Sequence, residues 1–414
     1  MHAANEPVPL GKTEIEFTQN GILVRGEAHV YLRLLPKPCL IIECDVPTLT
    51  DFQVGHNTSV LLIDNAINLR VILLQEKGKN GQSKLFFTPA REPCTVLEKA
   101  DEQLETVTFQ ILNFVKFHGN QRQKIEFDGW VIRISPTPGF SEIEKTLKAR
   151  GGYAVTHQGK LRQLNGNTFP IEDAQHILEK LQLYLSFIRG AYCSPISPVG
   201  TNRHGEEVWK QWGTRTVEPW GWTPSFFDTV PSIPLSEIFP GFWSALDKDP
   251  DRKNAVQIAL QWYLRSNRNN GDVHGGLFLS QSALERLADL YKFNKPSRSD
   301  KNIRDFLRTL KIDTEIPSPL KRLQSLVCKH PNPYDASDGP YVITRVRNNL
   351  IHPDHKWGNL AGDFEYQAWN LAQWYVELAL LAIFRFNGQY GNRLIPARPV
   401  YMVESVPWAA EQKD

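Results

Sequence analysis

The residues best suited to chemistry in this 414-residue chain lie close together near its end. Arg347 is followed directly by Asn348, and His352 comes five positions after the arginine. A guanidinium can hold a phosphate through forked hydrogen bonds, and an imidazole can move a proton near neutral pH. Among the eleven histidines, only His352 has an arginine at this spacing. Arg347, His352 and the supporting Asn348 are therefore candidates for cleaving a phosphodiester of RNA, with no metal.

The element that must position these residues is a predicted helix over residues 338–351. Its apolar positions recur at helical spacing, so one face can be buried and Arg347 can lie at the edge of that face. Those positions are Tyr341, Ile343, Val346 and Leu350. Pro353 disfavours helical geometry at the residue before it. We therefore expect the helix to end at His352 and to leave the imidazole at a surface.

The surrounding segments are also predicted to be helical, over residues 251–390. Apolar residues recur at helical spacing in five further stretches. These are residues 254–266, 277–291, 303–310, 320–327 and 365–386. Short or moderate connections between such helices are typical of an up-and-down bundle. Residues 391–414 are expected to form a C-terminal tail.

The N-terminal part, residues 1–165, is predicted to be rich in antiparallel strands. Short alternating or β-branched runs follow one another with no long helix between them, which is typical of a sandwich or open barrel. Two long alternating runs, 106–117 and 124–134, are expected to form a hairpin at residues 118–120. A second hairpin is expected around Gln158-Gly159, and a single helix over 141–149. The whole chain is thus predicted to be α+β, with a β-rich recognition or regulatory domain before the helices.

Residues 166–250 are predicted to contain one helix, over 171–188, and then a connector rich in proline and tryptophan. The connector, residues 194–234, holds four tryptophans: Trp209, Trp212, Trp220 and Trp222. It also holds four candidate RNA contacts: Arg203, His204, Lys210 and Arg215. Aromatic and basic side chains together can stack bases and bind phosphates. Tryptophans also pack at domain interfaces, so the structural reading stays open beside the RNA reading.

Composition restricts the class of protein. The hydrophobic content of 41% and the charged content of 22% are ordinary for a soluble globular protein. The net charge is only +2, so a basic surface must be local. Five cysteines lack paired spacing, so no zinc site and no other cofactor is expected. No apolar run is long enough to cross a bilayer and no secretory signal is present, so a cytoplasmic protein without membrane contact is expected.

The Arg-Asn-x3-His motif within a predicted helical bundle resembles the HEPN superfamily (higher eukaryotes and prokaryotes nucleotide-binding). The resemblance covers residues 253–387. The order of a β-rich region, a linker and a helical bundle is also similar to ApeA-like anti-phage proteins. This resemblance implies a metal-independent endoribonuclease in which Arg347, His352 and Asn348 act together. It further implies a homodimer in which two motifs face each other and form one composite site.

The function implied is RNA cleavage, of tRNA or mRNA, by a toxin-like effector of antiviral defence through abortive infection. The alternative is a non-catalytic module in which the same residues only grip a nucleotide or a partner. A third hypothesis, a carbohydrate-binding β domain with a structural helical tail, rests on the tryptophans alone.

Two further residues are candidates for supporting roles near the motif. Glu285 could pair with Arg347 and hold its rotamer, and His355 could carry a second proton or contact RNA. The stretch 268–274 is similar to the motif, but five residues separate Arg268 from His274, whereas four separate Arg347 from His352. Its Asn and Gly content predicts a turn between helices, so it is interpreted as structural.

Overall fold

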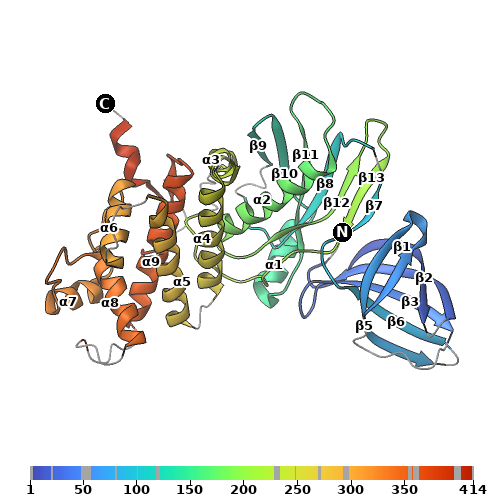
Figure 1. The fold of residues 1–414 in the computed structure, drawn as a ribbon, viewed down its shortest axis with the longest axis horizontal. Helices are drawn as coiled ribbons and strands as arrows, with labels where there is room; N and C mark the ends of the chain where they lie inside the picture. Colours follow the sequence, from blue (N-terminus) through green and yellow to red (C-terminus); the bar gives the residue numbers. More distant parts are fainter. Residues whose placement is uncertain are drawn as a thin grey trace. The chain divides into compact units, whose positions relative to one another are not determined.

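The computed structural model describes residues 3–19, 22–47, 57–79, 82–99, 101–117, 122–227, 234–247, 249–268, 272–291, 298–352, 357, 363–395 and 402–412. The chain forms two compact units. Unit 1 comprises Met1–Lys116, Asn120–Leu185 and Tyr192–Trp222, and unit 2 comprises Phe117–Gly119, Ser186–Ala191 and Thr223–Asp414. Unit 1 is mostly antiparallel strands and unit 2 is mostly helices, so the predicted α+β class is confirmed (Figure 1).

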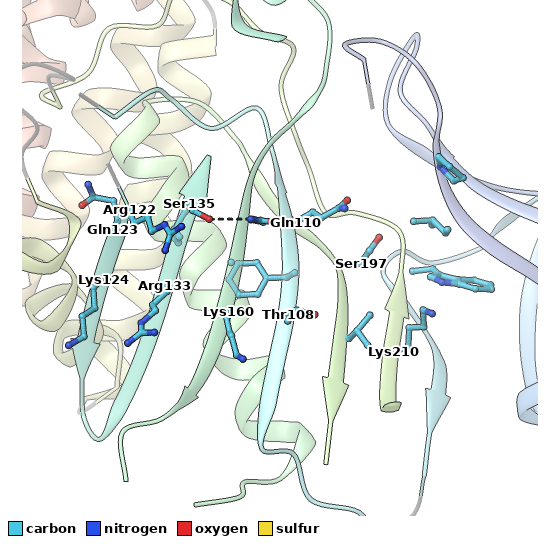
Figure 2. Close-up of a pocket in the computed structure, with 18 residues that line it drawn as sticks. Thr108, Gln110, Arg122, Gln123, Lys124, Arg133, Ser135, Lys160, Ser197 and Lys210 are labelled. Atoms are coloured by element: carbon cyan, nitrogen blue, oxygen red, sulfur yellow. Dashed lines mark hydrogen bonds between the residues drawn. The ribbon is translucent and has the colours of Figure 1, made fainter. Parts of the chain in front are cut away.

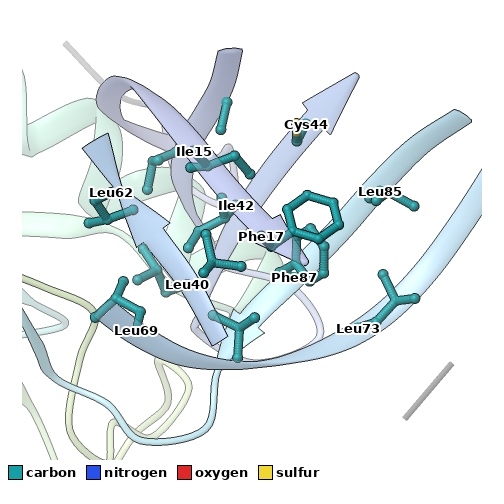
Figure 3. Close-up of a cluster of buried hydrophobic side chains, with 14 of the residues drawn as sticks. Ile15, Phe17, Leu40, Ile42, Cys44, Leu62, Leu69, Leu73, Leu85 and Phe87 are labelled. Carbon is teal, nitrogen blue, oxygen red and sulfur yellow. The ribbon is translucent and has the colours of Figure 1, made fainter. Parts of the chain in front are cut away.

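The first six strands close into an antiparallel barrel in the order β1-β2-β3-β6-β5-β4. They are β1 (Val8–Gln19), β2 (Ile22–Arg33), β3 (Cys39–Pro47), β4 (Asn57–Leu62), β5 (Ile67–Lys79) and β6 (Gln82–Pro89). Alternate side chains point inward because successive residues of a strand face opposite sides. Figure 3 shows the resulting core, in which Phe17 and Phe87 meet edge to face at 5.5 Å between ring centroids. The predicted β-rich region is confirmed, but the barrel is closed and a second sheet follows it.

That second sheet has seven antiparallel strands in the order β7-β13-β12-β8-β11-β10-β9. They are β7 (Cys94–Glu98), β8 (Thr106–Leu112), β9 (Gln123–Phe127), β10 (Trp130–Pro136), β11 (Val155–Gln163), β12 (Ser194–Thr201) and β13 (Glu207–Trp212). Helix α1 (Phe140–Arg150) packs against β11, and α2 (Ile171–Arg189) lies in the sequence between β11 and β12. Val107, Phe109, Ile132, Ile134 and Leu161 are buried on one side of the sheet.

Both predicted hairpins of this sheet need correction. The run 124–134 is itself a hairpin, because Asp128 and Gly129 adopt φ values of 44° and 80° and turn the chain between β9 and β10. Such positive φ values at both central residues are typical of two-residue hairpin turns. The predicted pairing of this run with 106–117 is wrong, since β8 pairs with β11 and β12. The turn predicted at 118–120 lies outside the described residues. At Gln158-Gly159 the chain does not turn, since β11 is continuous from Val155 to Gln163.

The prediction of a connector over 194–234 is also wrong for its first half, where β12 and β13 pair as a hairpin. The side chain of Asn202 closes this hairpin by accepting hydrogen bonds from the backbone of His204 and Glu206. Trp209 and Trp212 are buried within unit 1, whereas Trp222 is 81% exposed. The β-rich part of the chain therefore continues to residue 212 rather than ending at 165.

Unit 2 contains seven α-helices among its described residues. They are α3 (Leu235–Asp247), α4 (Pro250–Arg268), α5 (Val273–Ala288), α6 (Ser299–Thr309), α7 (Lys321–Lys329), α8 (Gly339–Ile351) and α9 (Asp363–Ile383). The predicted helices are all present, and α3 is an additional one that the sequence reading missed. Helix α9 is buried along most of its length and contacts α3, α4, α5, α7 and α8 (Figure 1). Among the described helices, none combines the length and apolarity that a bilayer crossing requires.

A buried arginine fixes the start of α8. Arg304 of α6 is fully buried, and its Nε and Nη2 donate to Oδ2 and Oδ1 of Asp338 at 2.6 and 2.9 Å. Its Nη1 donates to Asp335 at 2.6 Å. Asp338 is also the N-cap of α8, where its side chain accepts a hydrogen bond from the backbone of Tyr341. The same carboxylate thus starts the helix and anchors it to α6.

We expect Arg304→Lys to lower the free energy of unfolding by about 3–5 kcal/mol. The reason is that an ammonium cannot make the forked contact, so the buried carboxylate of Asp338 loses part of its hydrogen bonding. Urea unfolding followed by circular dichroism measures the change. The control is Arg308→Lys on the exposed side of the same helix, which should change little. Equal effects of the two substitutions would contradict the anchoring role of Arg304.

Candidate functional site

Helix α8 carries the predicted motif at its C-terminal end. The helix runs from Gly339 to Ile351, with Asp338 as N-cap and His352 as C-cap. The backbone N–H of His352 still donates to Asn348 at 2.8 Å, but its φ and ψ of −122° and 87° are no longer helical. His352 is exposed. The predicted extent of this helix and the exit of His352 from it are confirmed, and Pro353 lies outside the described residues.

Arg347 and Asn348 are brought together at this end of α8. Nη1 of Arg347 donates to Oδ1 of Asn348 at 3.1 Å. The guanidinium carbon lies 6.0 Å from the ring centroid of Phe278 on α5, a distance at which a cation and a ring attract. Within the described part of the chain, no carboxylate forms an ion pair with Arg347. Its charge is therefore held in place by neutral partners, which leaves it suited to bind an added anion.

The close approach of α8 to α9 depends on a glycine at the other end of the helix. A β-carbon at Gly339 would lie 2.2 Å from the hydroxyl oxygen of Tyr375, so any other residue would force the Tyr375 ring or one of the two helices to shift. Tyr375 is fully buried, and burial raises the pKa of its hydroxyl well above its usual value. The phenol is therefore neutral, and it contributes packing rather than charge.

The predicted supporting residue Glu285 has other partners. It accepts a short hydrogen bond from Ser299 of α6 and another, at 3.0 Å, from the side-chain amide of Gln281. The same amide lies 3.4 Å from the hydroxyl of Thr344 on α8. No ion pair joins Glu285 to Arg347 in the described structure, so Glu285 supports α8 only through Gln281. His355, the other candidate, lies outside the described residues.

A histidine–carboxylate pair joins α5 to α9, and its histidine lies one helical turn before Phe278. Nε2 of His274 is 2.8 Å from Oε2 of Glu365, the third residue of α9. Residues four apart share a face of a helix, so His274 and Phe278 point to the same side of α5. Asp272 caps α5 by accepting from the backbone of Gly275, which agrees with the structural interpretation of this stretch. Phe278 was not predicted as part of this site, although its position four residues after His274 indicates that both face the same side of α5. No local pattern in the sequence indicates that Glu365 contacts His274.

The four basic residues proposed as RNA contacts belong to unit 1, not to the unit that carries the motif. Arg203 and His204 are exposed in the turn between β12 and β13. Lys210 lies on β13, and Arg215 forms an ion pair with Glu179 at 2.8 Å. The structure therefore separates them into three places within unit 1 rather than one surface.

Two families of protein domains match parts of this chain. Residues 99–223 match the YopA central domain, and residues 249–404 match the YopA C-terminal domain. The SPbeta prophage-derived uncharacterized protein YopA of Bacillus subtilis (strain 168) is 25% identical, over 98% of this chain and 95% of its own length. The chain is similar to YopA along nearly its whole length. The first matched segment contains β8 to β13 of the seven-stranded sheet together with α1 and α2, and the second contains helices α4 to α9.

One solved structure also matches, that of K. pneumonia MrkH in its apo state. It is 16% identical to this chain and covers 42% of it and 85% of its own length, with a TM-score of 0.13. A TM-score this low does not indicate a shared fold.

We expect Arg347→Ala and His352→Ala each to change the free energy of unfolding by less than about 1 kcal/mol. The reason is that neither side chain belongs to the core, and among the described residues Arg347 makes one hydrogen bond, to Asn348, and one ring contact, to Phe278. Urea unfolding is the measurement. Ile343→Ala, on the fully buried face of the same helix, should cost about 2–5 kcal/mol. A loss of that size from either motif variant would show that the motif is part of the core.

Proposed function

We propose that the protein is a metal-independent endoribonuclease of the HEPN type. The observation that supports it is the arrangement at the end of α8. Arg347 is held beside Asn348 without a carboxylate partner in the described structure, and His352 ends the helix five residues after Arg347, where it is exposed. A cation for a phosphate and an imidazole for a proton therefore lie at the same end of α8. This is what cleavage by an internal nucleophile requires.

The reaction uses the 2′-hydroxyl of the RNA as nucleophile. His352 of one protomer accepts the proton of that hydroxyl while its oxygen forms a bond to the adjacent phosphorus. The bond from phosphorus to the 5′-oxygen breaks, and the imidazolium of the second protomer gives that oxygen a proton. Arg347 stabilises the negative charge that grows on the phosphorane oxygens, and Asn348 orients the guanidinium. The products are a 2′,3′-cyclic phosphate and a 5′-hydroxyl.

This proposal requires a homodimer, because each chain carries one histidine at this position. We place the two motifs face to face across an interface formed by the helices of unit 2, arranged as an up-and-down bundle. In the alternative, a non-catalytic module, a single copy of Arg347 and Asn348 binds the phosphate of a nucleotide and no bond breaks.

The biological role that fits this activity is that of a toxin-like effector of antiviral defence. Cleavage of tRNA or mRNA would stop growth of an infected cell before phage is released. The name of the B. subtilis relative gives a prophage origin, which fits a part in conflict between phages and their hosts. Unit 1 would then sense the signal or restrain the nuclease.

Incubation with total RNA in EDTA should give cleavage by the wild type. Arg347→Ala and His352→Ala should each lower the rate by about a hundred-fold or more, because each removes a group that acts in the transition state. Arg345→Ala is the matched control on the same helix, where the guanidinium lies 5.5 Å from the ring of Tyr341. His29→Ala, exposed in the barrel, is the control for histidine. DNA of the same sequence should stay intact, since it lacks the 2′-hydroxyl.

Cleavage that survives in both motif variants would reject the assigned residues. Absence of cleavage together with nucleotide binding that depends on Arg347 would favour the non-catalytic module. Expression in cells offers a parallel readout, since the wild type should slow growth and His352→Ala should relieve this effect.

A composite site predicts that one inactive chain impairs its wild-type partner. Mixed dimers of a wild-type and a His352→Ala subunit, co-expressed with two different tags and purified through both, should retain far less than half of the wild-type activity, because the base and the acid come from different protomers. Light scattering on the same sample checks that it is a dimer. A strictly monomeric protein that still cleaves RNA would contradict the shared site.

A further inference from the structure

Unit 1 contains a groove of about 810 Å³ on the exposed face of the seven-stranded sheet. Five cations line it: Arg122, Lys124, Arg133, Lys160 and Lys210 (Figure 2). Among the described residues that line it, none is Asp or Glu. The groove thus has a strong local charge in a chain whose net charge is only +2.

The strand register places three of these cations side by side. Lys124 on β9 pairs with Arg133 on β10, and Arg133 pairs with Lys160 on β11. Neighbouring strands lie about 4.8 Å apart, so the three charges fall within about 10 Å. Like charges directly opposite each other destabilise a sheet. An arrangement that is unfavourable in the free protein becomes favourable once a multivalent anion lies across it.

These cations are only partly neutralised by the protein. Lys124 is paired with Glu126, and Lys210 lies 3.3 Å from Glu207. Arg122, Arg133 and Lys160 form no ion pair within the described residues. An arginine without a carboxylate partner, beside a lysine on each neighbouring strand, matches the forked recognition of phosphate.

The row continues across the sheet with neutral residues. Lys160 pairs with Thr108 on β8, Thr108 pairs with Val199 on β12, and Val199 pairs with Lys210 on β13. Lys210 is therefore three strands beyond Lys160, or about 14 Å away. One end of the groove, on β9, β10 and β11, is therefore cationic. The neutral stretch follows on β8 and β12, and Lys210 on β13 lies beyond it.

The neutral stretch contains buried polar atoms that need a partner. Oε1 of Gln110, Oγ of Ser197 and Nε1 of Trp212 are buried, and within the described structure none has a hydrogen-bond partner. All three residues line the groove. Leaving such atoms unpaired costs free energy, so an occupant that offers both donors and acceptors is favoured here. A heterocyclic base carries ring nitrogens, carbonyl oxygens and amino groups, and so offers both.

We propose that this groove binds a nucleotide. Its phosphates contact Arg133, Lys160, Lys124 and Arg122, and its base reaches the polar atoms of Gln110, Ser197 and Trp212. The volume falls in the range of small-molecule sites, about 300–1,000 Å³. The site is separate from the motif on α8 and does not depend on the proposed ribonuclease activity.

The test is isothermal titration of the full chain with ATP, GTP, inorganic tripolyphosphate and a single-stranded oligonucleotide. ATP or GTP should bind more tightly than tripolyphosphate. The double substitution Arg133→Thr/Lys160→Thr should weaken every phosphate probe by at least about ten-fold, since each cation contributes charged hydrogen bonds. Gln110→Leu should weaken the nucleotides and leave tripolyphosphate unchanged. The control Lys145→Ala/Arg150→Ala removes two exposed charges from α1 and should bind as the wild type does.

The ligand-free double variant separates loss of binding from loss of folding. Removing two members of a like-charge row should raise its unfolding temperature by about 1–3 °C. The proposal would be overturned if this variant bound the phosphate probes as tightly as the wild type does. It would also be overturned if the wild type bound none of ATP, GTP and tripolyphosphate. Binding of tripolyphosphate alone would overturn the nucleotide assignment. Binding of the oligonucleotide alone, with a steep salt dependence, would make the groove a nucleic-acid surface instead.

Discussion

The placement of the motif helix depends on one buried guanidinium. Arg304 gathers the carboxylates of Asp300, Asp335 and Asp338, and the last of these begins α8. Burial opposes ionisation of Asp300, but hydrogen bonds and charges from Arg298 and Arg304 outweigh it and lower its pKa. Such a cluster is costly to desolvate, and here the forked hydrogen bonds from Arg304 to Asp338 join α6 to the start of α8. Whatever chemistry occurs at the far end of α8 therefore relies on an ion-pair cluster at its start.

The helical half of the chain could be predicted closely because its signals are local. The sequence prediction for the motif helix, residues 338–351, differs from α8 by a single residue, since Asp338 caps the helix instead of lying in it. A capping carboxylate, an apolar period and a following proline all act within a few residues. Arg304 was not predicted, because its carboxylate partners Asp335 and Asp338 come 31 and 34 positions later and no local pattern links them.

The sheet of unit 1 was predicted less well because its determinants are non-local. Gly159 was interpreted as a turn residue, but it lies within β11, where a β-carbon would come within 2.2 Å of the Phe109 ring on the neighbouring strand. The glycine is needed for packing, not for a bend. In the same way, Lys124, Arg133 and Lys160 lie apart in the sequence, and no local pattern links them. Only the register that pairs β9, β10 and β11 brings them into one row.

Closure of the barrel has a consequence for how unit 1 can meet other chains. Because β1 pairs with both β2 and β4, the six described barrel strands present no unpaired edge. The seven-stranded sheet does have edges, at β7 and β9. On β9, the exposed positions are Lys124 and Glu126, and charged side chains on an edge discourage an incoming strand. On β7 the backbone carbonyl of Val96 already accepts a hydrogen bond from the side chain of Asn65, and Val96 is fully buried. Unit 1 is thereby protected against aggregation by strand addition at the barrel, at β9 and at the middle of β7.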